Sequence, residues 1–129
     1  RGLNAAAHPN PSCEGNPTMS ADRSRYRCIS ATDAVALIRS KLGVALFDVR
    51  DRASYQRGHI DGAAHLTEDR FLTWTRRLDK ATPVLIYCYH GNASQTYAQM
   101  FVDFHFDRVF SIDGGYLALE AALSASEPA

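Results

Sequence analysis

The sequence has little cysteine and no excess of either charge. Its three cysteines are Cys13, Cys28 and Cys88, which are too few and too unevenly placed for a disulfide framework. Because the sequence has no CxxC pair and no Cys/His ladder, we expect no structural metal. Lys and Arg total 14, as do Asp and Glu. This balance provides no general basic field, so we expect neither nucleic acid nor an anionic membrane as a partner.

Long hydrophobic runs are also absent. No apolar stretch approaches the roughly 20 residues that cross a bilayer. Residues 1–18 lack the apolar core, about 7–15 residues long, that a secretory signal contains. Together with the low cysteine content, these absences predict a cytoplasmic protein in a reducing compartment.

Residues 1–18 differ in composition from the rest of the chain. They hold three of the five prolines and show no amphipathic period. Such a segment cannot bury enough apolar surface to order itself. We therefore predict a disordered leader over residues 1–18 and one domain over residues 19–129, with Met19 as a plausible start.

From Tyr26 onward, short apolar runs alternate with helical patterns. The runs predict strands at residues 26–29, 44–47, 63–66, 83–87 and 109–112. Capping residues and apolar positions at helical spacing predict helices at residues 30–42, 52–57, 67–78, 95–106 and 116–125. Cys28, in the first strand, is predicted to be a small core hydrophobe. The alternation is typical of a three-layer α/β domain with a mainly parallel sheet.

Cys88 lies where chemistry is expected in such a domain. Residues 48–50, 88–94 and 113–115 each follow a predicted strand, and ligands bind at the carboxyl ends of the strands in open α/β sheets. Cys88 stands between a buried strand and the start of a helix. The free backbone N–H groups of a helix N-terminus stabilise a thiolate and an approaching anion. We therefore predict that Cys88 is a nucleophile that acts on an anionic substrate.

The loop after Cys88 is small and weakly polar. Gly91 supplies a conformation that a β-carbon would resist, and its neighbours are compact enough to leave a bowl. His90 either contributes weakly as a cation when protonated or faces solvent. We predict that the loop residues bind the substrate: Tyr89, His90, Gly91, Asn92, Ala93 and Ser94.

Four ordered segments make the chain resemble the rhodanese family. They read DVR at residues 48–50, YQRGHIDGA at 55–63 (followed by HLT at 65–67), CYHGNAS at 88–94 and SIDGGY at 111–116. The second is similar to the GHIxGA element of the family. The resemblance is greatest to the small thiosulfate sulfurtransferases of the bacterial glycerol-3-phosphate regulon type, and it covers about residues 26–124.

This resemblance implies a five-stranded parallel sheet with helices on both sides and a catalytic Cys88 that carries sulfur. The implied enzyme takes sulfur from thiosulfate, holds it as a persulfide cradled by residues 89–93, and passes it to cyanide or to a thiol acceptor such as thioredoxin. This double displacement needs no cofactor. The larger two-domain rhodaneses carry basic residues in the loop, where this chain has Tyr89 and His90. We therefore expect weaker binding of thiosulfate.

Arg50 has two possible roles. It follows Asp48 at the end of a predicted strand, where a buried charge is costly unless it is paired. An ion pair that fixes the loop would satisfy this requirement. Alternatively, Arg50 attracts the substrate dianion directly, and it is therefore included among the candidate substrate-binding residues.

Two other functions stay open. A phosphatase or arsenate reductase on the same scaffold needs the longer Cys-x5-Arg loop, whereas this chain has Ser94 at the place of the arginine. A sulfur-carrier module would instead receive sulfur on Cys88 from a protein partner and pass it on.

Overall fold

A computed structural model describes residues 25–40 and 43–126. Its strands are β1 (Arg27–Ile29), β2 (Ala45–Asp48), β3 (Ala64–His65), β4 (Val84–Tyr87) and β5 (Val109–Ile112). All pair in parallel in one sheet of order β1-β5-β4-β2-β3. The predicted leader at residues 1–18 lies outside the described residues.

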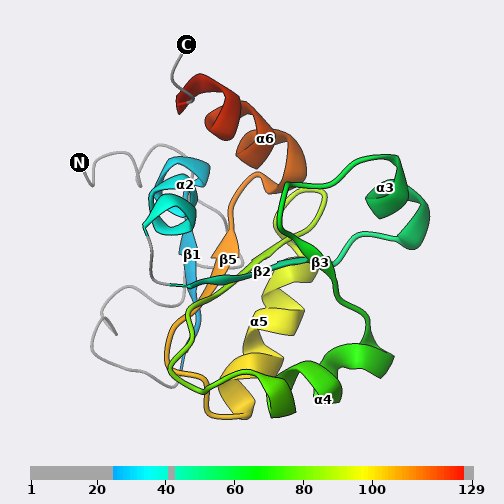
Figure 1. Cartoon of the computed structure of the whole chain (residues 1–129), viewed down its shortest axis with the longest axis vertical. Helices are drawn as coiled ribbons and strands as arrows, with labels where there is room; N and C mark the ends of the chain where they lie inside the picture. Colours follow the sequence, from blue (N-terminus) through cyan, green and yellow to red (C-terminus); the bar gives the residue numbers. More distant parts are fainter. Residues whose placement is uncertain (1–24, 41–42, 127–129) are drawn as a thin grey trace.

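Helices cover both faces of this sheet. They are α2 (Ala31–Arg39), α3 (Arg52–Arg57), α4 (Glu68–Arg77), α5 (Ala93–Asp103) and α6 (Gly115–Ser126). Figure 1 shows α2 and α6 on one face, α4 and α5 on the other, and α3 beyond the β3 edge. The predicted three-layer α/β fold with a five-stranded parallel sheet is confirmed. None of the helices in the described ranges has the length and hydropathy needed to span a bilayer.

Strand β4 runs through the centre of the sheet and supplies both cores. Its four residues are fully buried, and successive side chains of a strand point to opposite faces. Val84 and Ile86 accordingly join the core under α4 and α5. Leu85 and Tyr87 join the core under α2 and α6. Burial on both faces explains why this strand reads as a continuous apolar run.

The strand order places the carboxyl end of β4 at a crevice. From β2 the chain continues to β3 on one side, whereas from β4 it continues to β5 on the other. Neighbouring strands whose connections leave in opposite directions form a topological switch point, where open α/β sheets bind ligands. Asp48 ends β2, and Cys88 comes directly after β4.

Candidate active site around Cys88

Cys88 is nearly buried, with only 3% of its surface exposed. Its Sγ accepts a hydrogen bond of 3.0 Å from the backbone N–H of Gly91. The following helix, α5, begins at Ala93, and the side chain of its N-cap residue Asn92 makes no capping hydrogen bond. The first N–H groups of this helix are therefore not occupied by that side chain, and they lie next to the sulfur in the sequence.

These surroundings favour the thiolate. Burial raises the pKa of the Cys88 thiol, but hydrogen bonds from the Ser94 hydroxyl and from the backbones of Ser94, Gly91 and His90 outweigh it, so the pKa lies below its usual value. The local causes are thus burial and neutral donors. The thiolate, not the thiol, is the nucleophilic form of a cysteine.

Two fully buried serines, Ser94 and Ser111, form a hydrogen-bonded hydroxyl pair next to the Cys88 sulfur. The Ser94 Oγ lies 3.5 Å from the Cys88 Sγ and 2.7 Å from the Ser111 Oγ on β5. Neither serine is exposed to solvent. When Cys88 is ionised, Ser94 can donate its proton to the sulfur and accept the proton of Ser111 in exchange.

Gly91 and the start of α6 shape the loop. Gly91 has φ +108°, a conformation that residues with a β-carbon rarely adopt. The N–H of Tyr116 donates to the Cys88 carbonyl oxygen over 2.8 Å. A β-carbon on Gly115 would lie 2.1 Å from the Tyr89 carbonyl oxygen and 2.5 Å from that of Cys88. The backbone of α6 therefore packs directly against the cysteine loop.

The Arg50 guanidinium is engaged by the protein itself. It donates to the Asp48 carboxylate, with a shortest distance of 2.7 Å, and to the Gly58 carbonyl oxygen over 2.6 Å. It also lies 4.0 Å from the centre of the Tyr116 ring. Asp48 is fully buried and Arg50 is 8% exposed. These contacts favour the ion pair over direct attraction of substrate.

The Tyr89 side chain turns toward α3. Its hydroxyl contacts the Asp51 carboxylate and lies 2.5 Å from the Ser54 Oγ. Asp51 caps α3 by accepting from the Ser54 N–H. Hydrogen bonds from Tyr89, and then from Ser54, lower the pKa of Asp51 to about 2. Tyr89 therefore ties the exposed side of the loop to the start of α3.

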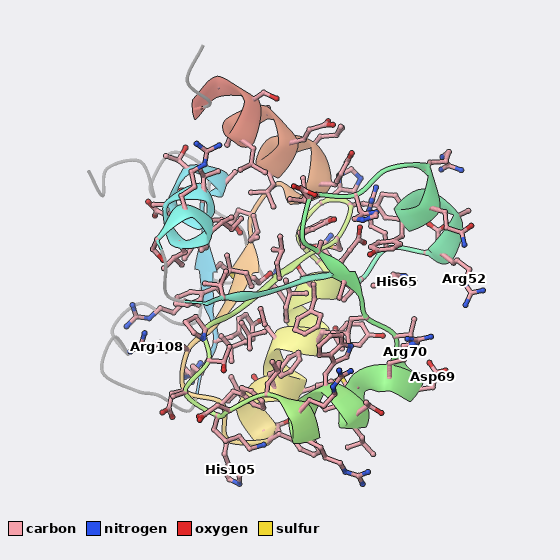
Figure 2. The ribbon with its side chains drawn as sticks, in the orientation of Figure 1. Arg52, His65, Asp69, Arg70, His105 and Arg108 are labelled. Carbon is pink, nitrogen blue, oxygen red and sulfur yellow. The ribbon has the colours of Figure 1, made fainter. Side chains whose placement is uncertain are left out.

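Several other polar side chains make no hydrogen bond to the Cys88 sulfur in the described part of the chain, where that sulfur bonds Gly91 and Ser94. His65 is hydrogen-bonded to the Arg50 carbonyl oxygen at 2.7 Å, so its ring is engaged by the backbone. Figure 2 shows Arg70, at the start of α4, on the same side of the molecule as His65. His105 and Arg108 precede β5, so they lie toward the amino-terminal edge of the sheet, opposite to the end where the Cys88 loop begins (Figure 2).

Comparison of the sequence with known proteins identifies its family. The rhodanese-like domain model matches residues 30–122. The chain belongs to the rhodanese family. A thiosulfate sulfurtransferase GlpE from Tolumonas auensis is 42% identical over 93 residues, covering 72% of this chain and 87% of the relative. The GlpE protein of Coxiella burnetii is 41% identical over 91 residues, covering 70% and 84%.

Solved rhodanese-like structures share the fold at lower identity. A Staphylococcus aureus rhodanese-like domain protein superposes with a TM-score of 0.62 at 21% identity, covering 71% of this chain and 89% of that one. The rhodanese-like domain of an Anabaena protein gives 0.64 at 24% identity, covering 78% and 83%. These similarities support the architecture of the rhodanese domain described above.

The structure brings most of the predicted site residues together, but with unequal exposure. Cys88, Gly91 and Ser94 are buried at the centre. The remaining loop residues form an exposed rim: Tyr89, His90, Asn92 and Ala93. Ser94, predicted to bind the substrate, has its buried hydroxyl next to the Cys88 sulfur and the Ser111 hydroxyl. Within the described ranges, no three His, Cys, Asp or Glu side chains gather into a group that could hold a metal ion.

Sequence reasoning missed several contributors to the site. Ser111 and Gly115 do not stand near Cys88 in the sequence, and only the fold shows their contacts with the loop. Gln95 directly follows the loop, and its bond to the Gly91 carbonyl oxygen was not predicted. One signal was available for Ser111, since a serine inside the apolar run 109–112 needs a buried polar partner. Cys28, predicted to be a small core hydrophobe, is half-buried in β1, whereas Cys88 is free and buried.

Proposed function

We propose that this rhodanese domain is a thiosulfate sulfurtransferase that carries sulfur as a Cys88 persulfide. The observation that carries the proposal is the 3.0 Å hydrogen bond from the Gly91 N–H to the Cys88 Sγ. It belongs to a set of donors that lowers the pKa of a nearly buried thiol. The relatives named thiosulfate sulfurtransferase support the same activity.

In the first half-reaction, the Cys88 thiolate attacks the outer sulfur of thiosulfate. A bond forms between Sγ and that sulfur, the sulfur–sulfur bond of thiosulfate breaks, and its electron pair leaves with sulfite. Cys88 then holds a persulfide anion. Backbone N–H groups of the loop, residues 89–94, stabilise this anion as they stabilise the thiolate.

In the second half-reaction, an acceptor removes the outer sulfur. Cyanide attacks it, the persulfide bond breaks, thiocyanate leaves and the Cys88 thiolate returns. A protein thiol of the thioredoxin type can take the place of cyanide, which would suit a cytoplasmic protein. Neither half-reaction requires a metal or an organic cofactor.

In our proposal, Arg50 has a structural role and does not contact the substrate. Its ion pair with Asp48 and its contact with the Tyr116 ring join the end of β2 to the start of α6. The substrate dianion is then held by backbone N–H groups on the rim of the loop. This arrangement supports the expectation of weak thiosulfate binding, since neutral donors attract a dianion less strongly than cations do.

The experiment is sulfur loading followed by intact-mass spectrometry. Wild-type protein treated with thiosulfate should gain one sulfur atom and lose it to cyanide with release of thiocyanate. The nearly isosteric Cys88→Ser variant should fold but neither gain sulfur nor turn over, because its hydroxyl is not ionised at neutral pH. Turnover by Cys88→Ser would refute the proposal.

The same measurement separates enzyme from carrier. A carrier would fail to load from thiosulfate but would load from the persulfide of a protein donor. Failure to load from either source would remove Cys88 as the sulfur site.

A further inference from the structure

The backbone N–H that donates to the Cys88 sulfur belongs to Gly91, a residue whose backbone is only weakly restrained by its own sterics. Gly91 adopts φ +108°, where a glycine meets little resistance but also gains little restraint. Its N–H must nevertheless point at the Cys88 Sγ, 3.0 Å away. A side chain that holds the Gly91 backbone would therefore control the donor without touching the sulfur.

Gln95 makes that contact. It lies in the first turn of α5, is 6% exposed, and donates from its Nε2 to the Gly91 carbonyl oxygen over 2.8 Å. Its Oε1 accepts a hydrogen bond of 2.8 Å from the Tyr26 hydroxyl. Both ends of the amide are thus engaged, which fixes its orientation. The helix supplies a rigid base for the contact, because the Gln95 N–H bonds the Asn92 carbonyl oxygen.

We propose that Gln95 is a positioning residue for sulfur transfer: held by Tyr26, it anchors the Gly91 carbonyl so that the Gly91 N–H stays directed at the sulfur. The inference rests on the proposed function for its role in turnover. Its structural part concerns only the reactivity of the Cys88 thiol. The chain of contacts runs from Tyr26 through Gln95 and Gly91 to Cys88.

Loss of this anchor acts on the anion more than on the fold. Without the Gln95 amide, the 91–92 peptide loses its anchor and the backbone torsions of Gly91 become freer. The N–H of the preceding 90–91 peptide then leaves the sulfur for part of the time. A thiolate that loses a hydrogen bond becomes harder to form. The persulfide that replaces it would lose the same support.

The test compares two glutamines on the same helix. Gln95→Met removes the amide at nearly constant length, and Gln99→Met is the matched control, since Gln99 is exposed and bonds only Asp103 among the contacts described for it. The readout is the rate of Cys88 alkylation by iodoacetamide between pH 5 and 10, with Cys88→Ser as the blank. We expect Gln95→Met to shift the midpoint of this curve upward and to slow alkylation at pH 6 about threefold to tenfold, whereas Gln99→Met follows wild type.

Tyr26→Phe provides a second variant that removes a single oxygen from a half-buried side chain. It should move the curve in the same direction by a smaller amount, and it decides the question if Gln95→Met does not fold. A curve that is unchanged in folded Gln95→Met, or unchanged in Tyr26→Phe where Gln95→Met is unfolded, would overturn the inference.

Sulfur loading keeps this outcome separate from the proposed function. If wild type fails to load sulfur from thiosulfate, the proposed function fails whatever the alkylation curves show. If wild type loads but Gln95→Met alkylates like Gln99→Met, only the positioning role fails.

Discussion

Substituting Gly115 by alanine tests whether the start of α6 holds the cysteine loop in place. The added β-carbon would lie 2.1 Å from the Tyr89 carbonyl oxygen, whereas ordinary contacts begin near 3.4 Å. Either the loop or the helix must therefore move by about 1 Å. Gly115 also has φ +67°, a left-handed conformation in which residues with a β-carbon are strained.

The expected cost has two sources. The left-handed conformation costs roughly 1–2 kcal/mol for alanine. Separation of α6 from the loop weakens the hydrogen bond from the Tyr116 N–H to the Cys88 carbonyl oxygen, which contributes about 1 kcal/mol. The free energy of unfolding should therefore fall by about 2–3 kcal/mol. Activity should fall by up to about a hundredfold, because a displacement of this size separates a nucleophile from its donors.

Gly62→Ala is the control. Gly62 has φ +89°, yet a β-carbon there meets nothing within 4 Å. It should cost the conformational part alone and leave kcat/KM near wild type. Urea unfolding measures the stability of both variants, and thiocyanate formation measures their activity. Equal stability losses in the two variants, together with full activity in Gly115→Ala, would refute the packing of α6 against the loop.

Three further predictions follow from other contacts. Asp48→Asn should lower the free energy of unfolding by about 3–5 kcal/mol in urea titrations, because it leaves the buried Arg50 charge uncompensated; a loss below 1 kcal/mol would contradict this. Ser111→Ala should slow iodoacetamide alkylation of Cys88 at pH 6, because Ser94 loses its partner, and an unchanged rate would argue against the hydroxyl pair. The pKa of Asp51 is lowered from 3.8 to about 2, so its stabilisation is complete above pH 4 and is lost as the pH falls toward 2. The stability difference between wild type and Asp51→Ala should shrink over that range in acid titrations, and a difference that grew on acidification would show the opposite shift.

The fold followed from patterns that depend on local sequence. The apolar run before Cys88 predicted a strand buried on both faces, and Ser30 with Asp33 predicted a helix start that the structure confirms through a capping hydrogen bond. Boundaries were less accurate. Helix α5 begins at Ala93 rather than Gln95, because Asn92 already has helical backbone angles. Strand β3 spans only two residues, since its pairing with β2 ends at His65.

The site was predictable only where adjacent residues build it. Cys88, Gly91 and Ser94 share one loop, so the strand-loop-helix pattern was enough to select them. The contacts of Ser111 and Gly115 depend on how β5 and α6 meet the loop, which no spacing within the sequence reports. The bond from Gln95 to Gly91 spans only four residues, but it depends on the positive φ of Gly91. Tyr89 was expected to face the substrate, yet its hydroxyl bonds Asp51 and Ser54 on α3. That contact exists only because α3 lies beside the loop in three dimensions.

The way in which the loop holds negative charge also limits its chemistry. Arg50 follows the end of β2, and Asp48 and Gly58 occupy its guanidinium. The sulfur therefore depends on neutral donors, which suit a compact, polarisable anion such as a thiolate or a persulfide. A phosphoryl group spreads its charge over three oxygens and needs a cation to neutralise them. The corresponding position holds Ser94, whose buried hydroxyl is shared between Cys88 and Ser111. The contacts that lower the pKa of Cys88 thus leave phosphate esters without the positive charge that their transfer requires.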